Sequence, residues 1–307
     1  MLNWLRLLAL AGITTLVAAC GGDDHPPSVV GVAQIDSRFS ILVEAISAAG
    51  LTETLNRDGA YTVFAPTNDA FASLLAELGV SKDALLANKP LLTTVLTYHV
   101  LPAKVEKAGV PAGKAVTTLQ GSIFKVDAVG GGLVITDGRN RASTITGTDI
   151  AARNGVVHVV NKVLLPADKT IVQTAIALPQ FSILVEAVLA AKLDAALSAT
   201  GPLTVFAPTN AAFAALLTEL DISKAALLAN TTLLTKVLTY HVIPARVLKA
   251  DVPVGTPVTT LQGEALSVDA TLAITDQRGR KAMITGTDVL ASNGVIHVID
   301  RVILPKP

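Results

Sequence analysis

The chain is poor in residues that cross-link a protein or give it a strong charge. It has one cysteine, Cys20, so no disulfide can form within it and each folded unit depends on its own core. Lysine and arginine number 24, and aspartate and glutamate also number 24, so the formal net charge is zero. Without a basic surplus to neutralise phosphates, nucleic acid is not an expected partner.

Charged and aromatic residues are also scarce. They make up 16% and 4% of the chain, whereas hydrophobic residues make up 51%, so we expect aliphatic cores. A domain of about 150 residues buries roughly 70% of its unfolded surface, which is sufficient for a stable core. Beyond Cys20 no uncharged apolar run approaches the ~20 residues that span a bilayer, so any membrane attachment would have to come from a lipid.

The first nineteen residues have the organisation of a secretory signal. They contain one base, Arg6, and no acid; an apolar stretch covers 7–17, and Val17-Ala18-Ala19-Cys20 ends in small residues. This end resembles the lipobox of bacterial lipoproteins, which implies removal of 1–19 and lipidation of Cys20. The alternative is an ordinary signal peptide that happens to contain a cysteine. By the same resemblance, Gly21 after the cysteine favours the outer membrane in a cell with two membranes.

A short polar segment follows the cysteine. Gly21–Ser28 reads Gly-Gly-Asp-Asp-His-Pro-Pro-Ser, and with Cys20 it forms the predicted lipidated tether, 20–28. At about 3.3 Å per residue this segment reaches at most roughly 26 Å. We therefore expect a lipid-anchored protein of the bacterial cell envelope that faces the periplasm or the exterior, with its first domain close to the membrane.

The remaining sequence consists of two similar copies. Thr62–Asn68 recurs as Thr204–Asn210 with an offset of 142 residues, and the offset falls to 139 between His158 and His297. A period this long indicates a duplicated domain and not a solenoid of small repeats. The predicted boundaries are 29–166 for domain 1, 167–170 for the linker and 171–307 for domain 2.

Within each copy the sequence pattern changes from helical in the first half to β-type in the second half. Phe39, Leu42, Val43 and Ile46 lie on one helical face. After residue 111 short β-type runs are separated by Gly, Asp and Asn, and Asn154-Gly155 is a strong signal for a two-residue hairpin turn. Helices followed by strands predict an α+β domain.

Three motifs, each present in both copies, resemble the signatures of the fasciclin domain. They are Thr-Val-Phe-Ala-Pro-Thr-Asn-x-Ala-Phe at 62–71 and 204–213, Tyr-His at 98–99 and 240–241, and Asn-Gly-Val-x-His at 154–158 and 293–297. The resemblance implies two tandem domains, each a wedge-shaped β-sandwich with several helices packed at one side. It also implies an extracellular role in adhesion or matrix binding.

In animal members of that family the Tyr-His region has been linked to receptors of the integrin type. The resemblance therefore makes candidate ligand-binding residues of Tyr98, His99, Tyr240 and His241. The alternative is a core role, in which each tyrosine packs its ring and bonds its hydroxyl, and each imidazole forms hydrogen bonds inside the domain.

No motif in the chain supports catalysis. Four of the five histidines fall at matching positions, but HxH, HExxH and CxxC spacings are absent, and a metal site needs three or four ligands. We therefore expect no catalytic residues, no metal and no cofactor. The predicted function is non-catalytic cell-surface adhesion or matrix binding. One alternative is a structural envelope protein that binds another envelope component or a polysaccharide; the other is a small-ligand carrier or an unrecognised hydrolase.

Overall fold

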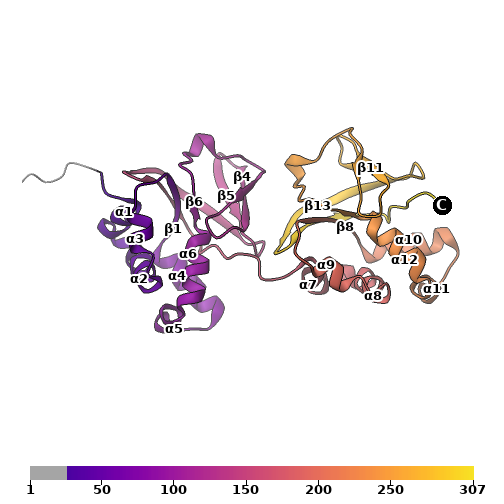
Figure 1. Ribbon diagram of the computed structural model, residues 1–307, viewed down its shortest axis with the longest axis horizontal. Helices are drawn as coiled ribbons and strands as arrows, with labels where there is room; N and C mark the ends of the chain where they lie inside the picture. Colours follow the sequence, from indigo (N-terminus) through magenta and orange to yellow (C-terminus); the bar gives the residue numbers. More distant parts are fainter. Residues whose placement is uncertain (1–25) are drawn as a thin grey trace, which may run out of the picture.

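The computed structural model describes residues 26–307, and Figure 1 shows two domains of similar build side by side. Residues 1–25 lie outside this part, so the signal peptide and the lipidation of Cys20 remain predictions, as does most of the tether. Among residues 26–307, no helix is both long enough and apolar enough to cross a membrane.

Helices form the first half of domain 1. They are α1 (Val29–Ile35), α2 (Ser40–Ala49), α3 (Thr52–Asn56), α4 (Asn68–Leu78), α5 (Lys82–Ala87) and α6 (Lys89–Tyr98), with short 3₁₀ turns at Ser37–Phe39 and Lys107–Gly109. Their ends follow local chemistry, because the Thr67 hydroxyl accepts the Ala70 amide at the start of α4 and Gly79 ends it at φ 64°.

Seven strands form one curled sheet in domain 1. They are β1 (Tyr61–Pro66), β2 (Val100–Leu101), β3 (Ala115–Thr117), β4 (Ile123–Val129), β5 (Gly132–Thr136), β6 (Ala142–Ala152) and β7 (Gly155–Val160), in the order β2-β1-β7-β6-β5-β4-β3. The β1–β7 pair is parallel and the others are antiparallel. Two register shifts in β6, on either side of Gly147, bend the sheet.

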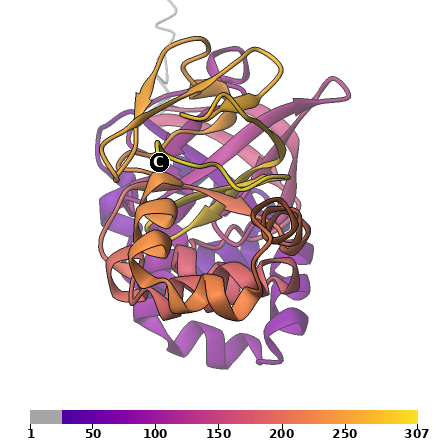
Figure 2. The same ribbon diagram turned by 90° about the vertical axis from the view of Figure 1, so that its right-hand side faces the viewer.

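Domain 2 repeats this plan. Its helices are α7 (Ile171–Ile176), α8 (Ser182–Ala190), α9 (Asp194–Ser198), α10 (Asn210–Leu220), α11 (Lys224–Ala229) and α12 (Thr231–Tyr240), and its 3₁₀ turns are Pro179–Phe181 and Lys249–Asp251. Its strands are β8 (Leu203–Pro208), β9 (Val242–Ile243), β10 (Val258–Thr259), β11 (Ala265–Val268), β12 (Ala273–Thr275), β13 (Lys281–Ala291) and β14 (Gly294–Ile299), in the equivalent order β10-β11-β12-β13-β14-β8-β9. The predicted pair of α+β domains is confirmed, and Figure 2 shows the helices of both domains below their sheets.

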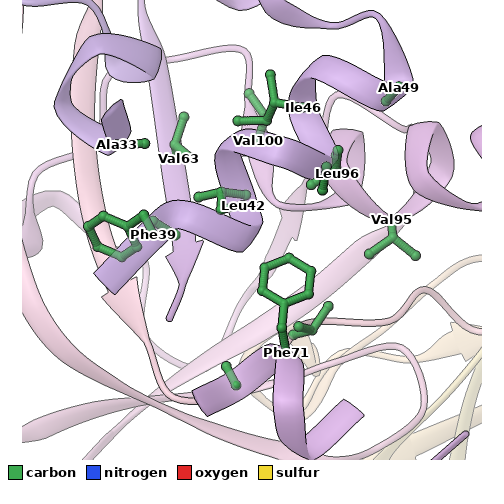
Figure 3. Packing of buried hydrophobic residues seen from close by; sticks show 14 of the residues in the cluster. Ala33, Phe39, Leu42, Ile46, Ala49, Val63, Phe71, Val95, Leu96 and Val100 are labelled. Carbon is green, nitrogen blue, oxygen red and sulfur yellow. The ribbon is translucent and has the colours of Figure 1, made fainter. Parts of the chain in front are cut away.

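Each domain has two apolar layers. Figure 3 shows the helical layer of domain 1, where Phe39 and Leu42, Phe71 of α4, and Val95 of α6 pack together beside Val63 of β1. The second layer lies within the curl of the sheet and includes Phe64, Tyr98, Phe124, Ile135 and Leu164. The Tyr-His motif ends α6 and so lies between these two layers.

The Asn154-Gly155 pair departs from the simple hairpin expectation. The tight turn is at Arg153-Asn154, and Gly155 is the first residue of β7, paired with Tyr61 of β1. A Cβ at this glycine would lie 2.1 Å from the carbonyl oxygen of Tyr61. The glycine is therefore required by the close approach of two parallel strands and not by the turn.

Candidate functional site

The four candidate ligand-binding residues lie inside the two domains. Tyr98 and Tyr240 have no exposed surface, and His99 and His241 are 1% and 2% exposed. In this conformation a macromolecular ligand cannot touch any of these side chains. Any effect of the motif on binding must therefore pass through the segments that it holds.

Each histidine of the motif is fixed through both ring nitrogens. His99 Nδ1 donates to the carbonyl of Val95 at 2.7 Å, and its Nε2 accepts the amide of Leu164 at 2.8 Å, which fixes the neutral tautomer. His241 makes the same pair of bonds with Val237 and Ile303, at 2.7 and 3.1 Å. Burial lowers the pKa of both histidines from 6.5 to about 4. Neither ring has a nitrogen free for a metal or a substrate proton.

The second pair of histidines is also bonded to the backbone. His158 Nδ1 accepts the amide of Asp149 at 3.2 Å, and its Nε2 donates to the carbonyl of Val105 at 2.9 Å. His297 bonds Asp288 and Val247 in the same way, at 3.3 and 2.8 Å. Within residues 26–307, no three side chains of His, Cys, Asp or Glu are grouped so that they could hold a metal ion.

The tyrosine of the motif holds a turn at the domain surface. Its hydroxyl donates to the carbonyl of Ile123 at 2.6 Å and accepts the amide of Gly138 at 2.8 Å. Gly138 belongs to the turn 137–141 (Asp-Gly-Arg-Asn-Arg), which we call the β5–β6 turn of domain 1. Tyr98 therefore joins a buried helix end to a surface turn.

A buried carboxylate completes the support of this turn. Asp137 is 1% exposed, and its Oδ1 accepts the amides of Arg139 and Arg141 at 3.0 Å. Its Oδ2 accepts the Leu165 amide at 3.0 Å and pairs with the Arg141 guanidinium at 2.8 Å. His99 bonds the neighbouring residue Leu164, so His99 and Asp137 hold the same segment, while Tyr98 holds the turn that carries Asp137.

The β5–β6 turn reaches domain 2. The Asn140 side chain donates to the carbonyl of Leu290 at 3.0 Å and accepts the Leu290 amide at 2.6 Å. Beside it, Lys125 of β4 pairs with Asp288 of β13 at 2.9 Å, with both side chains largely buried. Apolar contact among Ile123, Leu248, Leu290 and Val295 completes the junction. These direct contacts fix the two domains relative to each other.

A cleft of about 580 Å³ lies at this junction. Its lining includes Arg139 and Arg141 of the turn, Asp168 and Lys169 of the linker, and residues of α7, β13 and β14. Arg139 pairs with Asp168 at 3.0 Å, and Arg141 pairs with Glu77 at 2.8 Å. Pockets that bind small ligands measure about 300–1,000 Å³ and favour domain interfaces, so this cleft is the candidate binding site.

Reasoning from the sequence missed this cleft because its walls come from both copies. The signal that was present is a difference between the copies: Asn140 has Gly279 at its equivalent position, and Lys125 has Ser267. Both differences mark positions where domain 1 meets domain 2.

The model of the fasciclin domain matches this chain twice, at residues 37–166 and 179–305. Protein sll1483 of Synechocystis is 48% identical over 151 residues, which is 49% of this chain and 79% of that protein. The transforming growth factor-beta-induced protein ig-h3 of Sus scrofa is 43% identical over 143 residues, 46% of this chain but only 20% of its own length.

A mycobacterial relative and a solved structure also match. The immunogenic protein MPB70 of Mycobacterium bovis is 38% identical over 154 residues, which is 50% of this chain and 63% of that protein. The solved structure is the FAS1 domain pair of the insect cell adhesion molecule fasciclin I. The superposition includes 90% of this chain and 95% of that chain, with 19% sequence identity and a TM-score of 0.44.

Proposed function

Because the chain belongs to the fasciclin domain family, we propose that it is a non-catalytic adhesion or matrix-binding protein of the cell surface. The observation that carries this proposal is the fixed domain pair with a charged cleft at its junction. The histidines support the non-catalytic part, because each of the four that recur in both copies has both ring nitrogens bonded to backbone groups.

The rigid pairing suits weak adhesion sites. Two equivalent surfaces on one chain raise the overall affinity without new contacts, provided that their spacing matches the ligand. A junction of hydrogen bonds, an ion pair and apolar contact holds that spacing. We further propose that lipid on Cys20 anchors the pair to the envelope, which would multiply its binding sites across a surface.

The Tyr-His motifs enter this proposal as supports of the binding surface. Tyr98 and His99 hold the β5–β6 turn and its neighbouring segment, and that turn lines the cleft. A conservative change at the motif should therefore alter binding only as far as it alters the turn.

The testing experiment uses soluble Gly21–Pro307, immobilised on beads and checked for folding by circular dichroism. Its binding to matrix proteins, to cells of the same species and to a panel of polysaccharides is scored. Retention by cells or matrix, without any turnover of the ligand, supports the proposal. Folded protein that binds none of them contradicts it.

The cleft favours a second candidate function, the binding of a small polar ligand such as an oligosaccharide. Its volume is within the usual range for such ligands, and it offers both cationic and anionic side chains. Two results together would favour this function over adhesion. The immobilised chain should retain a soluble oligosaccharide but no cells, and the variants Lys169→Gln and Arg139→Gln should abolish that retention.

A further inference from the structure

An apolar groove recurs at the same place in both domains. The groove of domain 1 shares Arg139 with the interdomain cleft, whereas the groove of domain 2 shares no lining residue with it. In domain 2 the groove is lined by Phe213, Leu216 and Leu220 of α10, Leu227 of α11, and Leu234 and Val237 of α12. The equivalent helices α4, α5 and α6 line the groove of domain 1. The two grooves measure about 140 and 80 Å³, so the groove of domain 2 is the larger.

An arginine lies at the rim of each groove, and the two arginines have different partners. In domain 1, Arg139 pairs with the Asp168 carboxylate at 3.0 Å. In domain 2, the equivalent Arg278 donates from Nε to the carbonyl of Pro305 at 3.0 Å. Within residues 26–307 no side-chain carboxylate lies within 4.0 Å of the guanidinium nitrogens of Arg278, although its backbone amide donates to Asp276 at 2.9 Å. Pro307 stands at the position equivalent to Asp168.

The surroundings of Arg278 are also accessible. Its turn, 276–280, carries Gly279 where domain 1 has Asn140, so the side chain that ties the first turn to a neighbouring domain is missing here. The adjacent rim residue Leu220 is 36% exposed. Domain 2 therefore presents an apolar groove beside a cation whose terminal nitrogens face no carboxylate in the described chain.

We propose that this groove and Arg278 bind an acidic polypeptide segment that inserts one bulky apolar side chain. The size fits, because an apolar cavity of about 150 Å³ stays dry and accepts a group the size of benzene, which is comparable to a leucine or phenylalanine side chain. The charge fits as well, since arginine binds carboxylates through two parallel hydrogen bonds. Domain 1 shows the same kind of pairing within the chain, because Arg139, which is equivalent to Arg278, is paired with the Asp168 carboxylate.

The test is a titration of the ¹⁵N-labelled chain Gly21–Pro307 with the peptide acetyl-Gly-Leu-Asp-Gly-amide, followed by amide chemical shifts. Two control peptides replace Asp by Asn or Leu by Ala. The variants are Arg278→Gln and Leu220→Trp, which remove the cation and cover the groove from its exposed rim. Their matched controls in domain 1 are Arg139→Gln and Leu78→Trp.

We expect saturable shifts in α10, α12 and the turn 276–280. Arg278→Gln should weaken binding about tenfold or more, since a charge-assisted bond to the carboxylate is lost. Leu220→Trp should weaken binding comparably, while both domain 1 variants should stay within about twofold of the unaltered chain. The Asn and Ala peptides should bind correspondingly less well.

A parallel titration uses dodecanoate, an apolar chain with one carboxylate, in place of the peptide. Three results would overturn the proposal: no shifts in domain 2, equal binding of the Asp and Asn peptides, or shifts in domain 2 with dodecanoate but not with the peptide. The last result would assign the groove to a lipid chain. Because the titration needs no cell or matrix ligand, its failure would leave the adhesion proposal intact, and the reverse also holds.

Discussion

Acidification should destabilise both domains through their buried histidines. Burial lowers the pKa of His99 and His241 to about 4, whereas an unfolded histidine has a pKa near 6.5. The unfolded chain therefore binds protons more readily than the folded one between these values. The stabilisation is fully present above pH 6.5 and is lost as the pH falls toward 4.

The size of this effect follows from the two pKa values. One pKa unit corresponds to about 1.36 kcal/mol, so each histidine should cost about 2–3 kcal/mol of unfolding free energy between pH ~7.5 and pH ~4.5. With one such residue in each domain, the whole chain should lose about 5 kcal/mol from these two groups. The loss within each domain, about 2–3 kcal/mol, is a large share of a typical domain stability of about 5–15 kcal/mol.

The assay is guanidinium chloride unfolding at both pH values, followed by circular dichroism. The variant His99→Gln/His241→Gln should be less stable at neutral pH, but its loss on acidification should be smaller than that of the unaltered chain by about 5 kcal/mol. Val95→Ala is the matched control, because it perturbs the same site without a titrating group and should leave the pH dependence unchanged. If the double histidine variant loses as much stability on acidification as the unaltered chain, the assignment of buried neutral histidines is refuted.

Three further predictions concern the same framework. Tyr98→Phe leaves the Gly138 amide without a partner and should cost about 1–3 kcal/mol in chemical unfolding. The same change at the half-buried Tyr61, Tyr61→Phe, should be nearly silent. Asn154→Ala removes bonds to Val29, Leu55 and Arg57 and should lower the melting temperature by more than 5 °C for a loss of about 2–3 kcal/mol; an unchanged melting temperature would contradict the contacts. Gly155→Ala forces a Cβ against Tyr61 and should prevent stable folding of domain 1, which limited proteolysis would reveal as loss of the first domain only.

Much of the fold follows from local sequence. Thr67 and Gly79 bracket α4 by capping chemistry, and the apolar spacing from Phe39 to Ile46 matches the buried face of α2. The repeated motifs also identify the family, because they recur in order in both copies. These features depend on residues close together in the chain.

The candidate site could not be predicted in the same way, because its contacts join distant segments. His99 and His158 are bonded to backbone groups of Leu164 and Val105, and no residue type at those positions signals a partner for an imidazole. The bond between Asn140 and Leu290 depends on the turn conformation of Asn140, at φ 61°, and on the bend of β13. Neither feature has a local sequence signal of its own.

The cleft depends on a difference between two nearly equal copies. Asn140 and Lys125 look like ordinary surface residues until the fold places them against Leu290 and Asp288. Once the domain junction is known, their replacement by Gly279 and Ser267 in domain 2 becomes informative.

The central claim is that the two domains bind as one fixed pair. The most direct test measures the dissociation rate of the unaltered chain and of Asn140→Gly from the ligand surface identified on beads. This substitution copies the residue of domain 2, suits the positive φ of the turn and removes both bonds to Leu290. The control is Lys114→Gln, which removes a more exposed contact with Asp251 at 3.7 Å. We predict faster dissociation for Asn140→Gly alone, with an unchanged circular dichroism spectrum; equal rates for all three proteins would contradict the claim.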